Sequence, residues 1–385
     1  MTAQYTLYGS YASYYTAKTR AYLRKKGIPF VERLPSHPEF REHVRPTSGS
    51  HRIPQLLTPD GTVVQDSVEI VDFLEPRFPG VPAFPKSPCQ RSFVHLMELL
   101  GSQGLIRLAW LHRWLFEENH RFVKMDFGRS FRPQGNDEEL LKYGDLIADR
   151  MMSYGLPEST PEARGALDDQ YRELLQQFEA HWIEHPYLLG GHPSAAAYAL
   201  MGALHAHMGR DPAGLRVMQN HAPRTFRWVE HMLVPDVQSP EFGDRPVSYP
   251  TNDAVPETAL EILRFIALRF GDAFVLDSLA FQQAMARQGV ATGHELAPDN
   301  DQPILERERV HFRGADHNHA ADLHTVWVAQ RAQRHFQAQS EGDRERIREM
   351  LGDSTARELL EVPVTYSIER RNNRLLIGPV DPSNA

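Results

Sequence analysis

The sequence of 385 residues contains a single cysteine, Cys89. One cysteine excludes an intramolecular disulfide, and it excludes a structural zinc site built from cysteines. Chains with so little cysteine are typical of a reducing compartment. We therefore expect a cytoplasmic protein whose stability comes from an ordinary hydrophobic core.

Long apolar runs and clustered basic residues are missing as well. No window reaches the ~20 uninterrupted apolar residues that a membrane helix requires, and the first ten residues lack the blocks of a signal peptide. The formal charge of -8, without a long Lys/Arg run, argues against nucleic acid as a partner. We expect a soluble protein with a small-molecule ligand.

The length of the chain predicts two or three domains. Four prolines within residues 79–88 mark a linker after a small α/β segment. We therefore predict a domain at 1–80, an all-helical domain at 88–235, and a mostly helical extension at 236–385. Residues 234–256 are again rich in proline and are expected to lack helices.

The first segment alternates strand and helix patterns, and Gly27 ends the first helix. Within it we expect strands at 4–8, 29–34, 53–58 and 62–65, and helices at 15–27 and 66–78. The last two strands flank a Pro-Asp-Gly turn, which is typical of an antiparallel pair. Beyond the linker we expect helices over 90–124, 166–183, 195–208, 223–233, 257–287 and 320–360.

Three features of the later segments carry further expectations. Residues 298–319 are polar and are predicted to form a loop. Residues 364–382 are predicted to form two strands around Asn372-Asn373, because asparagine tolerates positive φ. His205 and His207 fall on different helix faces, so at most one should point inward.

A turn rich in hydroxyl groups separates the first strand from the first helix. Its hydroxyl residues are Ser10, Tyr11, Ser13, Tyr14, Tyr15 and Thr16. A strand-to-helix turn commonly holds polar residues, so the turn alone does not show whether one of them is a catalytic donor.

Three motifs together resemble the thioredoxin-like domain of the glutathione S-transferase superfamily. They are YGSYASYYTAKTR, HRIPQL and VQDSVEIVDFLEPRFP, and they cover residues 4–80 well. The resemblance over 90–233 rests on the helix pattern and on PYLLGGHPSAAAYAL, while residues 234–385 extend past the usual family length. The implied fold is a thioredoxin-like α/β domain followed by an all-α transferase domain, extended at the C-terminus.

The resemblance implies a glutathione site. A cis peptide between Ile53 and Pro54 would expose the Ile53 backbone to a peptide-like ligand. Asp66 and Ser67 open a helix, where free amides and the helix dipole favour the γ-glutamyl carboxylate, and Asp66 would accept from the ammonium. Arg52 matches a position near the glycyl end, although a solvated loop arginine is an equally good interpretation.

The resemblance also implies a donor that stabilises the glutathione thiolate, since a free thiol has a pKa of ~8.5. Alignment on serine-type members places Ser13 there, with Ser10 and Tyr11 as alternatives. The chain departs from the family at Tyr14, where a proline often follows the donor. It also departs at Ala197, which interrupts the capping box expected after Ser194. The turn holds no cysteine, which argues against a thiol–disulfide mechanism.

Other clusters have weaker functional meaning. Trp110 and Trp114 belong to an aromatic group that would line a hydrophobic substrate site or simply fill the core. A polar segment holds a set of possible metal ligands: His311, Asp316, His317, His319 and His324. Their spacing matches no metal-ligand pattern, and we expect no metal.

Two functions remain open from the sequence. The first is a glutathione transferase of detoxification type, with glutathione as co-substrate and a small hydrophobic electrophile as second substrate. The second is a non-catalytic glutathione-binding or scaffold protein with the same fold. A homodimer is expected by resemblance only.

Overall fold

The computed structural model describes residues 4–80, 82–297 and 304–381. The chain divides into two compact units. The first unit comprises Met1–Ala83 and Leu105–Pro250, and the second comprises Phe84–Gly104 and Thr251–Ala385. The three domains drawn from the sequence stay a prediction about folding units.

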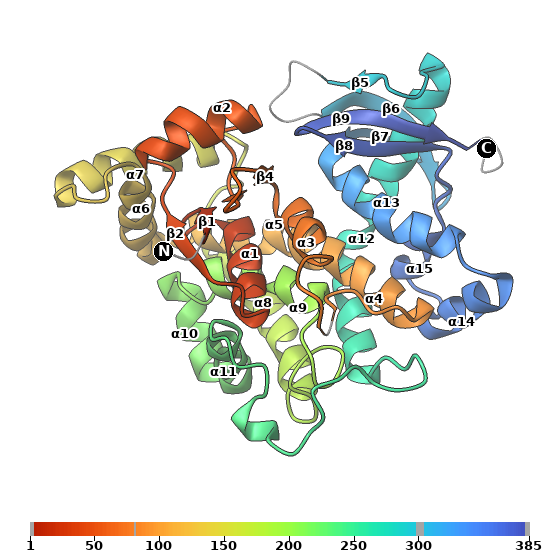
Figure 1. Ribbon diagram of the computed structural model, residues 1–385, viewed down its shortest axis with the longest axis horizontal. Coiled ribbons are helices and arrows are strands. Elements are labelled where there is room, and N and C mark those ends of the chain that lie inside the picture. Colours follow the sequence, from red (N-terminus) through yellow and green to blue (C-terminus); the bar gives the residue numbers. More distant parts are fainter. Residues whose placement is uncertain (1–3, 81, 298–303, 382–385) are drawn as a thin grey trace. The chain divides into compact units, whose positions relative to one another are not determined.

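A four-stranded mixed sheet forms the N-terminal part of the first unit (Figure 1). Its strands are β1 (Tyr5–Tyr8), β2 (Phe30–Arg33), β3 (Gln55–Leu57) and β4 (Val63–Gln65), in the order β2-β1-β3-β4. β1 runs parallel to β2, whereas β3 is antiparallel to both β1 and β4. This sheet with its helices is thioredoxin-like, so the predicted fold class of the segment is confirmed.

Helices flank the sheet strands as the sequence predicts. α1 (Tyr14–Lys25) begins after the N-cap Ser13 and stops before Gly27, whose φ is +64°. α3 (Ser67–Leu74) begins after Asp66. Between β2 and β3 lie the π-helical η1 (Phe40–Val44) and the short α2 (Arg45–Ser48).

The rest of the first unit is helical. Its helices are α5 (Leu105–Leu115), α6 (Glu117–Phe131), α7 (Asp137–Met152), α8 (Pro161–His181), α9 (Ala195–Met201), the π-helical η3 (Gly202–His207), α10 (Pro212–His221) and α11 (Pro223–Met232). Local sequence sets several of their starts: the Asn136 side chain accepts from the N–H of Glu139 in a capping box, and Thr160 caps α8.

The central helix formed by α9 and η3 is buried along its whole length. His205 and His207 are both only 6% exposed, so the prediction that at most one points inward is wrong. A helix surrounded by neighbours has no solvent face to which the second histidine could turn. Ser194 occupies the N-cap without a capping side-chain hydrogen bond.

The second unit contains α12 (Glu257–Gln288), whose 32 residues exceed the 21 of α8 in the first unit. The helices of this unit are α4 (Pro88–Leu99), the π-helical η2 (Leu100–Gly104), α12, α13 (Leu323–Gln337), α14 (Glu341–Leu351) and α15 (Thr355–Glu361). The predicted helical stretch 90–124 is therefore not one helix but several, and the breaks follow Leu99, Gly104 and Leu115.

A hairpin replaces most of the predicted polar loop at 298–319. β6 (Ile304–Phe312) pairs antiparallel with β7 (Ala315–Asp322) around Arg313 and Gly314, both at positive φ. The loop prediction is thus wrong over 304–319, and 298–303 lies outside the described residues. Charged residues fill positions 306–309 of β6, and one of its two buried positions is Glu308, so the strand lacks the apolar alternation that would have marked it.

A second small sheet has the order β5-β9-β8. β8 (Tyr366–Arg371) and β9 (Arg374–Val380) pair around Asn372 and Asn373, with φ of 49° and 65°, which confirms the predicted turn. β5 (Glu295–Leu296) pairs with β9. The extension therefore contains the two predicted strands at its end and, in addition, β5 and the β6–β7 hairpin.

Residues 234–256 contain only a short 3₁₀ turn, η4 (Pro240–Phe242), in agreement with their proline content. Across the described residues, no helix combines the length and the hydropathy that crossing a membrane would demand.

Candidate functional site

Strand register brings the three motifs together at one end of the N-terminal sheet. Tyr8, the last residue of β1, pairs with Gln55, and Gln55 pairs with Gln65 at the end of β4. Next to these three paired residues along the chain lie the turn that follows β1, Pro54 before β3 and Asp66 after β4. The backbone N–H of Asp66 donates to the Pro54 carbonyl oxygen at 3.2 Å. Motifs that lie far apart in the sequence thus meet at one edge.

Ser13 has the geometry of a helix N-cap. Its backbone is extended, with φ of -80° and ψ of 121°, and its Oγ accepts from the N–H of Thr16 at 3.3 Å. A hydroxyl that accepts one hydrogen bond keeps its own proton for donation. The half-buried Ser13 hydroxyl can therefore cap α1 and donate to a bound anion at the same time.

The alternative donors have different surroundings. Ser10 is 4% exposed, and its carbonyl oxygen accepts from the N–H of Ser13 at 3.2 Å. Tyr11 is 44% exposed, and the Arg20 guanidinium lies 4.0 Å from its ring centroid. Ser10 is thus less accessible than Ser13, while the Tyr11 ring is engaged by a cation.

Tyr8 stands at the end of β1 and is fully buried. Its hydroxyl donates to the Glu39 carboxylate, and burial together with this bond raises the pKa of Tyr8 far above its usual value. The phenol therefore stays protonated and committed to Glu39. This pairing could not be anticipated, because Glu39 lies in the irregular segment after β2.

Asp66 and Ser67 open α3 beside the turn. Asp66 has a φ of +90°, which is unusual for a residue with a side chain, and its carboxylate accepts from the N–H of Val68 at 2.7 Å. Ser67 is the first residue of α3 and is 3% exposed. Strained backbone of this kind gathers at ligand sites, and the helix start offers amide donors to an anion.

The Ile53–Pro54 peptide is cis, as predicted. Ile53 is half-buried, and Pro54 leads directly into β3. The loop before it is held by the Gln55 side chain, whose amide donates to the carbonyl oxygens of Ser50 and Arg52 at 2.8 Å each. Arg52 itself is exposed.

Two buried arginines hold the backbone of the turn that precedes Ser13. Arg20 on α1 is fully buried, and its Nη2 donates to the Ser10 carbonyl oxygen at 3.1 Å. The same guanidinium binds the Glu32 carboxylate in a bidentate manner, at 2.7 and 2.6 Å. A buried charge needs such a partner, since desolvating an unpaired guanidinium is costly.

Arg113 on α5 is the second of these arginines and is 2% exposed. It donates to the Ala12 carbonyl oxygen at 3.1 Å and to the Asp211 carboxylate at 2.7 and 2.9 Å. Sequence reasoning missed this residue. The available signal was a charged residue inside the apolar stretch WLHRWLF, which favours a buried ion pair.

Burial and arginine charges both act on the histidines near the turn. Burial lowers the pKa of His205 to about 3, and the charges of Arg20, Arg210 and Arg24 lower it further. Burial and the charges of Arg113 and Arg210 likewise hold the pKa of His207 well below its usual value. Burial, the larger cause, disfavours a charge of either sign, whereas the arginine charges by themselves favour an anion.

The two tryptophans proposed for a hydrophobic site differ in exposure. Trp114 is 3% exposed and packs in a core cluster with Val123 and Ala148, and Trp110 is half-buried against this cluster. Trp110 lies one helical turn before Arg113, which contacts the turn at Ala12. Only Trp110 therefore presents accessible ring surface on that helix face.

The histidine-rich segment is a hairpin with ion pairs. His311 and Asp316 lie on facing strands at 3.0 Å, and His319 contacts Asp277 of α12 at 2.8 Å. Within 4–80, 82–297 and 304–381, no group of three or more metal-ligating side chains has the geometry to hold an ion. The expectation that no metal is bound stays an expectation.

Known proteins resemble the chain mainly through its first segment. Residues 7–82 match the family described as glutathione S-transferase, N-terminal domain. No curated protein matches the chain in sequence.

Several solved structures align with the chain at low identity and with TM-scores below 0.5. A glutathione S-transferase from Methylobacterium radiotolerans, in complex with glutathione sulfonate, is 19% identical with a TM-score of 0.36, and covers 65% of this chain and 97% of its own. The transferase GSTFuA3 from Phanerochaete chrysosporium is 16% identical with a TM-score of 0.45, and covers 60% and 97%. The beta-etherase LigF from Sphingobium is 19% identical with a TM-score of 0.41, and covers 60% and 94%.

The matched region contains the four-stranded sheet, the turn before α1 and the start of α3. Residues 7–82 therefore form a domain of the family described as glutathione S-transferase, N-terminal domain.

Proposed function

We propose that the protein is a glutathione transferase that binds glutathione at the edge of the sheet beyond Tyr8, Gln55 and Gln65. The convergence of three separate motifs at this edge is the observation that carries the proposal. Glutathione transferases from other organisms bind glutathione or its sulfonate, which supports the choice of ligand.

Each end of glutathione has a proposed partner at this edge. The Ile53 backbone would pair with the cysteinyl unit. The amides at the start of α3 and the Ser67 hydroxyl would hold the γ-glutamyl carboxylate, with Asp66 accepting from its ammonium. The exposed Arg52 would lie toward the glycyl carboxylate.

Ser13 would donate its proton to the glutathione sulfur and so favour the thiolate. Arg20 and Arg113, each paired with a carboxylate, would assist by holding the backbone of the turn that carries Ser13. The thiol proton passes to solvent. The sulfur then forms a bond to an electrophilic carbon, and a leaving group departs with its electron pair or the carbon accepts the pair by addition.

Calorimetry with glutathione is the first test of this proposal. We expect one glutathione per chain with micromolar to millimolar affinity, and a thiolate absorbance band in the ultraviolet near neutral pH. Absence of heat would reject a glutathione protein of any kind. Binding without the thiolate band would reject the transferase and leave a binding protein.

The second candidate, a non-catalytic glutathione-binding or scaffold protein, has one observation in its favour. Trp114 is buried in a core cluster, so one of the two proposed walls of the electrophile site has no accessible surface. Turnover of a panel of electrophiles would decide against this candidate. A cytoplasmic homodimer remains part of the proposal, and analytical ultracentrifugation that finds only monomer would remove it.

A further inference from the structure

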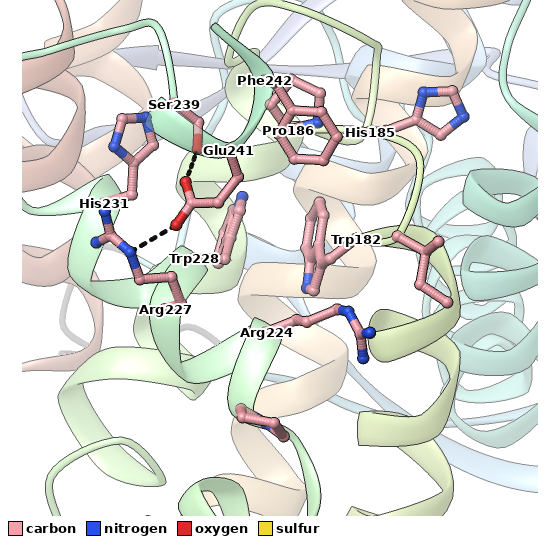
Figure 2. A pocket seen from close by; sticks show the side chains of 12 residues that line it. Trp182, His185, Pro186, Arg224, Arg227, Trp228, His231, Ser239, Glu241 and Phe242 are labelled. Atoms are coloured by element: carbon pink, nitrogen blue, oxygen red, sulfur yellow. Dashed lines mark hydrogen bonds and ion pairs between the residues drawn. The ribbon is translucent and has the colours of Figure 1, made fainter.

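A second concave site lies in the helical part of the first unit. Its volume is ≈ 540 Å³, and its lining comes from the end of α8, from α11 and from the segment around η4 (Figure 2). We call it the aromatic pocket. None of the residues proposed to bind glutathione line it, so its occupant does not depend on the proposed function.

Two stacked tryptophans form the floor of the aromatic pocket. The ring centroids of Trp182 and Trp228 are 4.8 Å apart and the rings are nearly parallel, at 11°, and the Phe178 ring also stacks with Trp182, with centroids 5.9 Å apart. Each tryptophan is only 5% exposed. Within the described part of the chain, neither indole nitrogen has a hydrogen-bond partner. Both indole nitrogens are buried, so the floor offers the edges of the rings rather than polar donors to the pocket.

The walls of the aromatic pocket are mainly flat or apolar. Figure 2 shows Pro186 and Phe242 on the side of the indoles opposite Arg224. Ile183 also lines the pocket and is 60% exposed, which is high for isoleucine in a folded protein. Apolar surface left open in a concave site is typical of a place where a ligand binds.

Charge at the rim is predominantly positive. Arg224 is 55% exposed and makes one long contact, 3.4 Å, with Glu179. Arg227 pairs with Glu241 at 2.8 Å, and Glu241 also accepts from Ser239. The one carboxylate that lines the pocket is therefore already paired, whereas the Arg224 guanidinium retains donors for an anion.

Two histidines that line the pocket are uncharged at neutral pH. Burial lowers the pKa of His185, and the charge of Arg245 acts in the same direction. Burial, together with the charge of Lys25, lowers the pKa of His231. Neither imidazole cancels the positive charge of the arginines. Neither supplies the negative charge that a bound cation would require.

The geometry points to a binding site for a small planar aromatic carboxylate in the aromatic pocket. The volume falls within the range of pockets for small molecules. The apolar wall of Ile183, Pro186 and Phe242 matches a flat apolar ring, and Arg224 matches a carboxylate, which a guanidinium binds in a bidentate manner. A cation of the same shape would meet two arginines and no unpaired carboxylate.

Calorimetry with 1-naphthoate and with the neutral 1-naphthamide tests this inference on the full chain. We expect one naphthoate per chain, bound about tenfold more tightly than naphthamide. Arg224→Gln should weaken naphthoate about tenfold and leave naphthamide nearly unchanged. Arg216→Gln is the matched control, since Arg216 is 54% exposed, pairs with Glu118 and lies outside the pocket.

A second variant tests the same preference for an anion at a position other than Arg224. Ile183→Glu adds a negative charge at an exposed wall position, where folding should not suffer, and should weaken naphthoate more than naphthamide. Three results would overturn the inference. They are no binding of naphthoate, equal effects of Arg224→Gln and Arg216→Gln, and displacement of naphthoate by S-methylglutathione, which would place it at the sheet edge instead.

Discussion

Ser13 combines two roles that a hydroxyl can perform together. Its oxygen accepts from the N–H of Thr16, and its proton stays available for a sulfur at the start of α1. The neighbouring carbonyl oxygens of Ser10 and Ala12 are held by Arg20 and Arg113. A donor on a turn that is fixed from two sides loses little freedom when a ligand binds.

Replacing Ser13 should therefore affect turnover far more than binding. We predict that Ser13→Ala lowers kcat about 100-fold and changes the glutathione Kd by less than about threefold, because one donor to a developing anion is lost. Steady-state kinetics and calorimetry measure the two quantities. Ser10→Ala and Tyr11→Phe serve as comparisons, and a larger loss in either would move the donor role to that residue.

Tyr14, which follows the proposed donor Ser13, packs against Gly202 of the central helix. Tyr14 is 5% exposed, and its ring lies so close to Gly202 that an added Cβ would approach Cε1 to 2.2 Å. A proline at position 14 would leave this space empty. The departure from the family at Tyr14 is thus matched by a glycine on the helix that it contacts.

We predict that Gly202→Ala lowers the free energy of unfolding by about 1–3 kcal/mol, because the buried Tyr14 ring has no room to move. Gly165→Ala is the matched control. Gly165 lies inside α8 with nothing within 4 Å of an added Cβ, so alanine should raise stability there by up to about 1 kcal/mol. Urea unfolding measures both free energies. If Gly202→Ala left the free energy of unfolding unchanged, the Tyr14 ring would have to move aside for the added methyl group.

At the scale of elements, the turns and strands that could be predicted from the sequence are those whose own residues favour the observed backbone geometry. The turn before α1, the hairpin of β3 and β4, and the turn at Asn372 and Asn373 have side chains that favour their own backbone geometry. The hairpin of β6 and β7 was missed because charged residues fill 306–309 and one of its few buried positions is Glu308. Where buried positions are few and one of them is charged, a strand leaves no apolar period of two in the sequence.

The turn between β8 and β9 can be tested directly. We predict that Asn372→Ala lowers the free energy of unfolding by about 1 kcal/mol, because Asn372 has a φ of 49° that alanine adopts at a cost. Asn372→Gly should be nearly neutral, since glycine reaches this conformation freely. Thermal unfolding compares the two, and equal losses would mean that the asparagine side chain matters rather than its backbone.

At the scale of the whole molecule, many histidines are buried without charge. Burial lowers the pKa of His181 and His205 to about 3 and that of His192 to about 4. His95 in the second unit also has a pKa well below its usual value, mainly because it is buried. Unfolding returns each of them to water, where a histidine titrates near ~6.5.

Stability should therefore fall as the pH falls. Between about 6.5 and about 4 the unfolded chain binds more protons than the folded one, so the stabilisation is complete above 6.5 and is lost on acidification. Each such histidine contributes up to about 1.4 kcal/mol per pH unit. Urea unfolding at several pH values measures the slope.

Two variants separate buried from exposed histidines in this test. His205→Gln should flatten the dependence, because His205 is 6% exposed. His221→Gln should leave it unchanged, because His221 is exposed. A free energy of unfolding that stays constant from pH 7 to pH 5 would contradict the argument.

The sequence by itself determined the N-terminal α/β segment, its cis Ile53–Pro54 step and the start of a helix at Asp66 and Ser67. These features depend on residues close together in the chain, whose own backbone preferences select the geometry. Local patterns also placed most helices and the last hairpin.

Only the tertiary structure decided which partners these residues meet. Arg113 reaches Ala12 across 101 positions, and the floor of the aromatic pocket joins Trp182 to Trp228. The burial of both His205 and His207 likewise depends on neighbours on every side of one helix. Such contacts arise from how elements pack, and a periodic pattern records only that a side chain is inside, not what lies against it.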